Sequence, residues 1–227
     1  MVAGDFAADA LRAVDEGLVE IRDGREIVWP HCGARPLLID QGERKSTPRR
    51  ISVRVEDVLT LAALYELVER RGWPRDHVWL EPKIGRGWPL DLAVRQGPGP
   101  AAQMVIAAEA KSSDALANKL VTEVRECGAR GEHDEGACGK RNSHRKYRAL
   151  VAESPCVFLV LSPTCRRAYS VRKGTRAGEL ELVERDGIPT GGRGLATNPV
   201  TPATKSASSP PDHPMQCSLG EPSRRRR

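Results

Sequence analysis

The stretch Met104–Asp114, MVIAAEAKSSD, decides which fold we expect for this chain. Its apolar first half predicts a buried strand, and Ser113 or Asp114 can cap a helix that follows it. Because side chains alternate along a strand, Glu109 and Lys111 would lie on the same face. The stretch therefore predicts a buried strand that ends with an acid and a base side by side.

The sequence on either side predicts more helices and strands. Residues 55–71, VEDVLTLAALYELVERR, carry apolar side chains at the spacing of a buried helix. Further strands are expected at 77–84, 89–94, 156–162 and 168–172, and further helices at 114–127 and 144–153. This order predicts an α/β domain on a mixed sheet flanked by helices, with the very apolar strand 156–162 near its centre.

Composition divides the chain into three parts. Residues 1–50 form an ill-defined N-terminal segment, in which 5–21 could be a short helix. Residues 51–186 carry the predicted α/β domain. Residues 187–227 are rich in Pro, Ser and Gly and end in four arginines, so we expect a disordered basic tail.

Charge and hydropathy limit the classes of function. The 227 residues carry a formal net charge of +6, which favours a polyanionic partner such as nucleic acid. No apolar run approaches the roughly 18 residues needed to span a bilayer. We therefore expect a soluble, cytoplasmic protein whose six scattered cysteines are reduced thiols.

Asp91 is a second acid that we expect near the end of the strand that carries Glu109. An antiparallel hairpin that pairs Val94 with Met104 would place Asp91 diagonally across from Glu109 on one face, about 7–8 Å away. A slip of one residue would put the two acids on opposite faces. Magnesium prefers hard oxygen ligands, so Asp91 and Glu109 form a candidate Mg²⁺ site, with Lys111 beside it to act on water and stabilise charge.

Asp91 followed by Glu109, Ala110 and Lys111 resembles the PD-(D/E)XK nuclease superfamily, which has the restriction-endonuclease-like fold. The resemblance implies an αβββαβ core and hydrolysis of phosphodiester bonds in nucleic acid, DNA more than RNA. It also implies that Asp91 and Glu109 bind Mg²⁺ or Mn²⁺ and that Lys111 is the catalytic lysine. One departure is that Pro89 stands two residues before Asp91, whereas the family's proline directly precedes its aspartate.

Other interpretations of this motif stay open. A Glu-x-Lys at a strand end is, by itself, most often a solvated charged pair. The fold could also belong to a catalytically inactive module that binds nucleic acid or another partner. Some members of the superfamily add an acid from the first helix, for which Glu66 and Glu69 are the candidates here.

An insert before the last helix holds a second candidate site. Cys127, His133, Cys138 and His144 offer thiolates and imidazoles, which suit Zn²⁺, but no Cys-x-x-Cys pair is present. A flexible insert that happens to contain these residues is the alternative. Five basic residues of the same region could contact a phosphate backbone or form a solvated helix face: Lys140, Arg141, Arg145, Lys146 and Arg148.

Overall fold

The computed structural model describes residues 3–22, 26–29, 33–36, 38–40, 51–81, 90–139 and 141–191. The chain divides into two compact units, Met1–Arg193 and Gly194–Arg227. The second unit lies outside the described residues, and so does the predicted disordered tail beyond residue 191.

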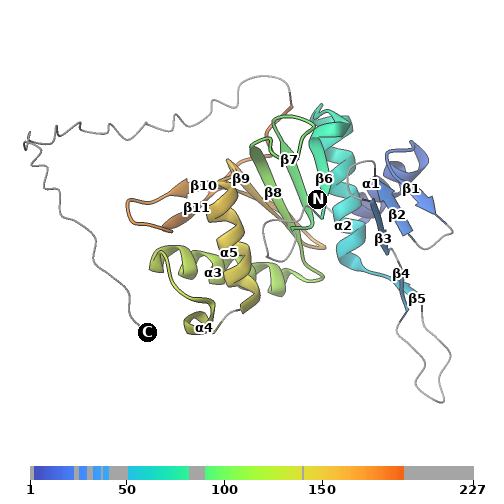
Figure 1. Ribbon diagram of the computed structural model, residues 1–227. Helices are drawn as coiled ribbons and strands as arrows, with labels where there is room; N and C mark the ends of the chain where they lie inside the picture. Colours follow the sequence, from blue (N-terminus) through green and yellow to red (C-terminus); the bar gives the residue numbers. More distant parts are fainter. Residues whose placement is uncertain are drawn as a thin grey trace, which may run out of the picture. The chain divides into compact units, whose positions relative to one another are not determined.

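A six-stranded sheet forms the centre of the first unit (Figure 1). The strand order is β11-β10-β9-β8-β7-β6, and neighbouring strands are antiparallel except for the parallel pair β8 and β9. This mixed sheet confirms the predicted α/β class and the inner position of β9. The strands are β6 Val78–Leu80, β7 Leu92–Arg95, β8 Met104–Ala110, β9 Val157–Leu161, β10 Arg166–Lys173 and β11 Leu180–Arg185.

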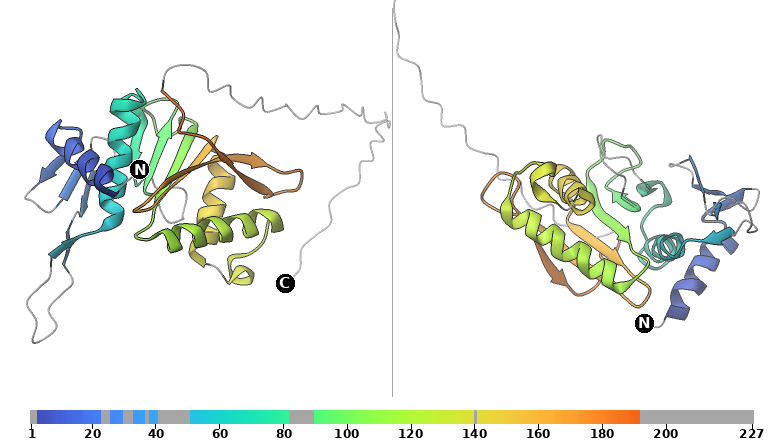
Figure 2. Two further views of the ribbon diagram at one scale, coloured as in Figure 1. Left: turned by 180° about the vertical axis from the view of Figure 1, so that it is seen from behind. Right: turned by 90° about the horizontal axis from the view of Figure 1, so that it is seen from below.

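Helices lie on both faces of the sheet (Figure 2, right). On one side are α1 (Ala3–Asp15) and α2 (Val55–Tyr65), the latter continuing into a π-helical segment, Glu66–Arg70. The other side carries α3, α4 and α5. These helices connect β8 to β9, as the parallel pair requires, because parallel strands need a long crossover. Their bounds are Asp114–Arg130, Glu135–Cys138 and Arg141–Glu153. The order α2, β6, β7, β8, α3, β9 agrees with the predicted αβββαβ order.

The N-terminal strands attach to the β6 edge of this sheet. The strands β1 (Glu20–Arg22), β2 (Glu26–Trp29) and β3 (Gly33–Pro36) form an antiparallel sheet. Trp29 Nε1 donates a hydrogen bond of 2.7 Å to the carbonyl oxygen of Val78 on β6. A separate pair joins β4 (Leu38–Asp40) to β5 (Ile51–Val53).

A buried group of charges joins the α1 and α2 side to β10. Arg166, at the start of β10, pairs with Asp9 of α1 and with Glu66 of the π-helical segment. Its guanidinium also lies 4.3 Å from the ring centroid of Phe6. Since Asp9 also pairs with Arg70 at 2.5 Å, these contacts tie three elements together through opposite charges.

The register of β7 and β8 differs from the predicted one. Val94 pairs with Ile106 rather than with Met104, and a β-bulge between Val94 and Arg95 accounts for one residue of this difference. Arg95 takes Met104 as its partner instead. At Val94 the difference is two residues, so each side chain stays on the face that alternation assigned to it.

The face of the sheet toward α3 and α5 is closely packed. Ala107, Phe158 and Val160 of the strands join Val124 of α3 and Leu150 of α5 in one buried cluster. No helix in the described part of the chain is both long enough and apolar enough to cross a membrane.

Candidate functional site

Asp91 lies immediately before β7 and is held against the end of β8. Its backbone N–H donates to the carbonyl oxygen of Ala108 at 3.2 Å, and its Oδ2 accepts the N–H of Ala110 at 2.7 Å. The pairing of β7 with β8 ends at Leu92 and Ala108, and the N–H of Asp91 bonds to the carbonyl of the same Ala108, so Asp91 lies beside the end of β8 near Glu109. The prediction placed the two acids diagonally on one face; the structure bonds Asp91 to the backbone of the residues on either side of Glu109.

Glu109 is almost completely buried, with 3% of the residue exposed. Its Oε1 accepts a hydrogen bond of 2.6 Å from Lys111 Nζ, and its Oε2 lies 2.7 Å from Lys146 Nζ. Burial raises the pKa of the Glu109 carboxyl, and repulsion by Asp91 raises it further, while the two lysines act in the opposite direction. The site therefore contains two acids and two ammonium groups that partly compensate one another.

Lys146 enters this site from α5 and is only 4% exposed. Sequence reasoning placed it among residues that could contact phosphate and gave it no part in the Asp91–Glu109 pair. The helical spacing of the sequence indicated that Lys146 would be buried. Lys146 shares a stripe with Ser143, Tyr147 and Leu150, all of them buried, at intervals of three and four residues.

A further acid, Glu56 in the first turn of α2, reaches the end of β8. Its Oε1 accepts the N–H of Ser112, next to Lys111, at 3.1 Å. The two helix acids suggested by sequence lie in other surroundings. Glu66 is buried and paired with arginines, and Glu69 is exposed.

The four cysteine and histidine residues of the insert are brought together. Cys127 lies on α3, His133 in the loop after it, Cys138 at the end of α4, and His144 on α5. One ligand atom from each lies within 4.8 Å of those of the other three. This buried Cys2His2 group could hold a metal ion such as zinc.

The surroundings shift the pKa values of this group in different directions. Burial raises the pKa of the Cys127 thiol to about 12, and the neighbouring Cys138 adds to the effect. The carbonyl of Gly131 raises the pKa of His133, whereas burial and then the charge of His133 lower that of His144. A bound cation would favour the deprotonated thiols, because thiolate is the form that binds metals.

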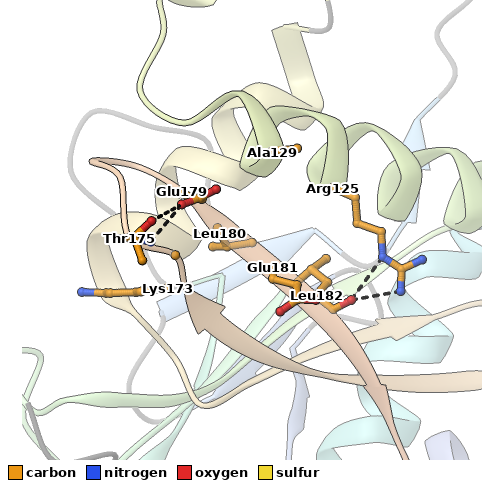
Figure 3. Close-up of a pocket in the computed structure, with 9 residues that line it drawn as sticks. Arg125, Ala129, Lys173, Thr175, Glu179, Leu180, Glu181 and Leu182 are labelled. Carbon is orange, nitrogen blue, oxygen red and sulfur yellow. Dashed lines mark hydrogen bonds between the residues drawn. The ribbon is translucent and has the colours of Figure 1, made fainter.

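A surface hollow of about 640 Å³ lies between α3 and the β10–β11 hairpin (Figure 3). The guanidinium of Arg125 crosses it to donate to the carbonyl oxygen of Leu182, at 3.2 Å from Nε and 3.0 Å from Nη2. Glu179 lines its other end, where its Oε2 accepts the N–H of Thr175 at 2.8 Å. The candidate site residues are not among the described residues that line this hollow.

Neither protein-family models, nor curated proteins, nor solved structures gave a significant match to this chain. What the structure establishes is therefore an α/β protein with a six-stranded mixed sheet and a buried Cys2His2 group that could hold a metal ion.

Proposed function

We propose that this chain is a metal-dependent nuclease of the PD-(D/E)XK type, which hydrolyses phosphodiester bonds in nucleic acid, DNA rather than RNA. One observation carries the proposal. Asp91 lies where β7 begins and is bonded to the backbone of Ala108 and Ala110, the residues on either side of Glu109, and Lys111 Nζ lies 2.6 Å from Glu109 Oε1. The order of elements around them supports the same family.

The donor set suits Mg²⁺ or Mn²⁺. Asp91 and Glu109 supply carboxylate oxygens, and the carbonyl oxygen of Ala110, the residue after Glu109, accepts from Lys111 Nζ at 3.0 Å. Hard oxygens are the ligands that these ions prefer. A carboxylate has about four lone-pair sites, so the ion pairs of Glu109 leave it able to bind a cation as well. Bound there, the ion would neutralise phosphate charge and lower the pKa of a water molecule.

The residues of the chain then take separate roles. Lys111 would orient the attacking water and stabilise the charge that develops on the phosphate. Lys146 would hold the buried Glu109 carboxylate in place from α5. Glu56, through its hydrogen bond to Ser112, would fix the turn that carries Lys111.

Basic side chains on α5 favour a polyanionic partner. Arg148 of α5 is exposed, and Arg145 is partly exposed while pairing with Glu135. Together with the net charge of +6, these side chains favour the phosphate backbone of a nucleic acid.

A catalytically inactive nucleic-acid-binding module is the second candidate. The observation that favours it is the pairing of both Glu109 oxygens with lysines, at 2.6 Å to Lys111 and 2.7 Å to Lys146. A buried carboxylate that is already compensated in this way needs no metal ion for its stability.

Cleavage of supercoiled plasmid and of a single-stranded RNA by the purified chain would test the proposal, with Mg²⁺, Mn²⁺ or a chelator present. We expect plasmid cleavage with either metal, its loss in Asp91→Asn and Glu109→Gln, and normal cleavage by the control Glu181→Gln, an exposed change on β11. If the parent binds DNA but neither cuts it nor binds Mn²⁺ in a calorimetric titration, the inactive module is correct. Cleavage that survives in both acid variants would reject the proposed site.

A further inference from the structure

We infer that Cys127, His133, Cys138 and His144 bind one zinc ion, which has a structural role and sets the position of Lys146 against Glu109. The zinc ion would thus be distinct from the metal of the proposed nuclease site. The inference rests on the geometry of the insert and not on whether the chain cuts nucleic acid.

Two pairs of ligand atoms lie at distances close to those of a tetrahedral zinc site, and all four atoms lie within 4.8 Å of one another. Zinc bonds of 2.0–2.3 Å place neighbouring ligand atoms about 3.3–3.8 Å apart. Cys127 Sγ and Cys138 Sγ are 3.2 Å apart, and His144 Nδ1 lies 3.2 Å from His133 Nε2. The sulfur separation is far longer than the roughly 2.05 Å of a disulfide bond. The four atoms would draw together around the ion from their present spacing of up to 4.8 Å.

The second nitrogen of His133 is held in the way that metal-binding histidines require. Nδ1 lies 2.7 Å from the carbonyl oxygen of Gly131, so Nδ1 carries the proton and Nε2 is left to bind the metal. The hydroxyl of Tyr147 donates to the same carbonyl at 2.7 Å. The ring of Tyr147 also stacks on His133, with centroids 5.6 Å apart. These contacts orient the histidine before any metal binds.

The site has the character of a structural zinc site rather than a catalytic one. Four protein ligands complete a tetrahedron, whereas catalytic zinc keeps a position open for water or substrate. Cys127 is 1% exposed and His144 is 3% exposed, so a substrate has little access to the ion.

Zinc would add a cross-link to the insert. Between α3 and α5 the described residues 131–139 include the four-residue helix α4, and most of residues 132 to 139 are at least partly exposed. One ion bound by ligands from α3, the loop, α4 and α5 would cross-link all four segments. Such a cross-link fixes the start of α5.

The position of α5 matters because it carries Lys146. His144 and Lys146 are two residues apart, about 200° around the helix, so they project to different sides. His144 faces the metal ligands of the insert, and Lys146 reaches Glu109 on β8 at 2.7 Å. A zinc ion bound by His144 would fix the position of α5 and therefore the position of Lys146 relative to Glu109.

Metal analysis of the tag-free protein tests the zinc site. We expect about one zinc ion per chain, its loss in Cys138→Ser and its retention in His144→Cys, which keeps a ligand at that position. Cys156→Ser and Cys165→Ser are matched controls, because both thiols lie outside the group, and both should keep the ion. Replacement by Co²⁺ should give the absorption of a tetrahedral ion with two thiolates. A parent protein that takes up no zinc even when refolded with it, or a Cys138→Ser variant that keeps it, would overturn the inference.

Hydrogen exchange with and without zinc tests the effect on α5. We expect faster exchange over 132–153 after removal of zinc, with unchanged protection of β8 and β9. Equal protection of α5 in both states would show that zinc does not position Lys146. Equal loss throughout β8 and β9 would also reject the local role, since zinc would then support the whole domain. Neither experiment measures cleavage, so their failure is distinguishable from failure of the proposed nuclease activity.

Discussion

Lys146 Nζ on α5 lies 2.7 Å from Glu109 Oε2 on β8, and both residues are almost fully buried. This ion pair joins the helical layer to the strand that carries the Glu-x-Lys motif. Glu109 also pairs with Lys111 at 2.6 Å, so each of its oxygens faces a different ammonium group.

Replacement of Lys146 by methionine should destabilise the fold. The variant keeps the length of the side chain but removes one partner of a buried carboxylate. Breaking a buried pair costs about 3–5 kcal/mol, and the remaining pair with Lys111 should reduce the loss to about 2–3 kcal/mol. Urea unfolding measures the difference, with Lys119→Met on the exposed side of α3 as the control. An unfolding free energy equal to that of the parent would mean that Lys146 contributes nothing to holding Glu109.

Asp91 should have separable effects on structure and activity. Asp91→Asn keeps an oxygen that can accept the N–H of Ala110, whereas Asp91→Ala loses that hydrogen bond of 2.7 Å. We expect the alanine variant to lose about 1 kcal/mol of stability and the asparagine variant to lose less. Both should lose metal-dependent cleavage, because neither supplies the second carboxylate. Thermal unfolding together with plasmid cleavage checks both statements, and equal stability of the two variants would contradict the structural role.

Lys111→Ala should separate metal binding from the rate of cleavage. The two carboxylates remain, so Mn²⁺ binding measured by calorimetry should persist. Cleavage should fall by at least about 100-fold, the range expected on removing a group that acts on the water or on the developing charge. Loss of Mn²⁺ binding together with the rate would instead indicate that Lys111 holds the ligands in place.

The α/β class and the order of elements could be predicted because apolar spacing distinguishes the helix at 55–65 from the strands around it. Alternation also indicated which residues share a face. This assignment stayed correct because the register error was two residues, an even number. The bulge at Val94 was not predictable, since neither Val94 nor Arg95 carries a local signal for it. Strand β11 was missed although Leu180 and Leu182 alternate with exposed acids, the pattern of a half-buried strand.

The two sites differ in what the sequence could reveal. The Glu-x-Lys motif spans the end of β8 and the residue after it, so its geometry follows from local structure. Lys146 reaches Glu109 only because α5 packs on the sheet, a contact between residues far apart in the chain. Likewise the Cys2His2 group has no short ligand pair, and the approach of Cys127 to His144 depends on how α3 and α5 pack together.

Gly128 should resist substitution because α3 packs closely against β11 there. A Cβ atom at Gly128 would lie 2.1 Å from the carbonyl oxygen of Leu180, so the backbone would have to move. We expect Gly128→Ala to cost about 3 kcal/mol or more of stability, at the upper end of the range for overpacking. Gly99→Ala is the matched control, because an added Cβ there meets nothing within 4 Å. Chemical denaturation compares the two, and a stable Gly128→Ala protein would show that β11 is not held as closely as described.

Glu179 should make stability depend on pH in the acid range. Hydrogen bonds from Arg176, first from its backbone and then from its side chain, hold the pKa of the Glu179 carboxyl at about 2. A carboxyl with a lowered pKa stabilises the folded state above its ordinary value of 4.5, and this contribution is lost as the pH falls from 4.5 toward 2. In Glu179→Gln that part of the acid sensitivity should disappear, whereas Glu181→Gln should retain it. The measurement is the thermal midpoint of each protein between pH 2 and pH 5, which covers the folded-state pKa of about 2 and the ordinary pKa of 4.5. Parallel curves for parent and Glu179→Gln would contradict the role of this turn.

Two truncations should separate the residues that support the fold from those that do not. Trp73, buried after the π-helical segment, donates from Nε1 to the carbonyl oxygen of Pro189 at 3.1 Å, and the N–H of Gly191 donates to the carbonyl oxygen of Arg71 at 2.6 Å. A chain that ends at Gly191 keeps these contacts, and the residues it lacks have few large apolar side chains, so its thermal midpoint should match that of the parent.

A chain that ends at Gly187 loses both hydrogen bonds and exposes the indole, which should lower the midpoint by about 5 °C. Differential scanning calorimetry on the two chains measures the difference. Equal midpoints would show that Pro189 and Gly191 do not stabilise the domain, and a lower midpoint for the longer chain than for the parent would show that residues beyond Gly191 do.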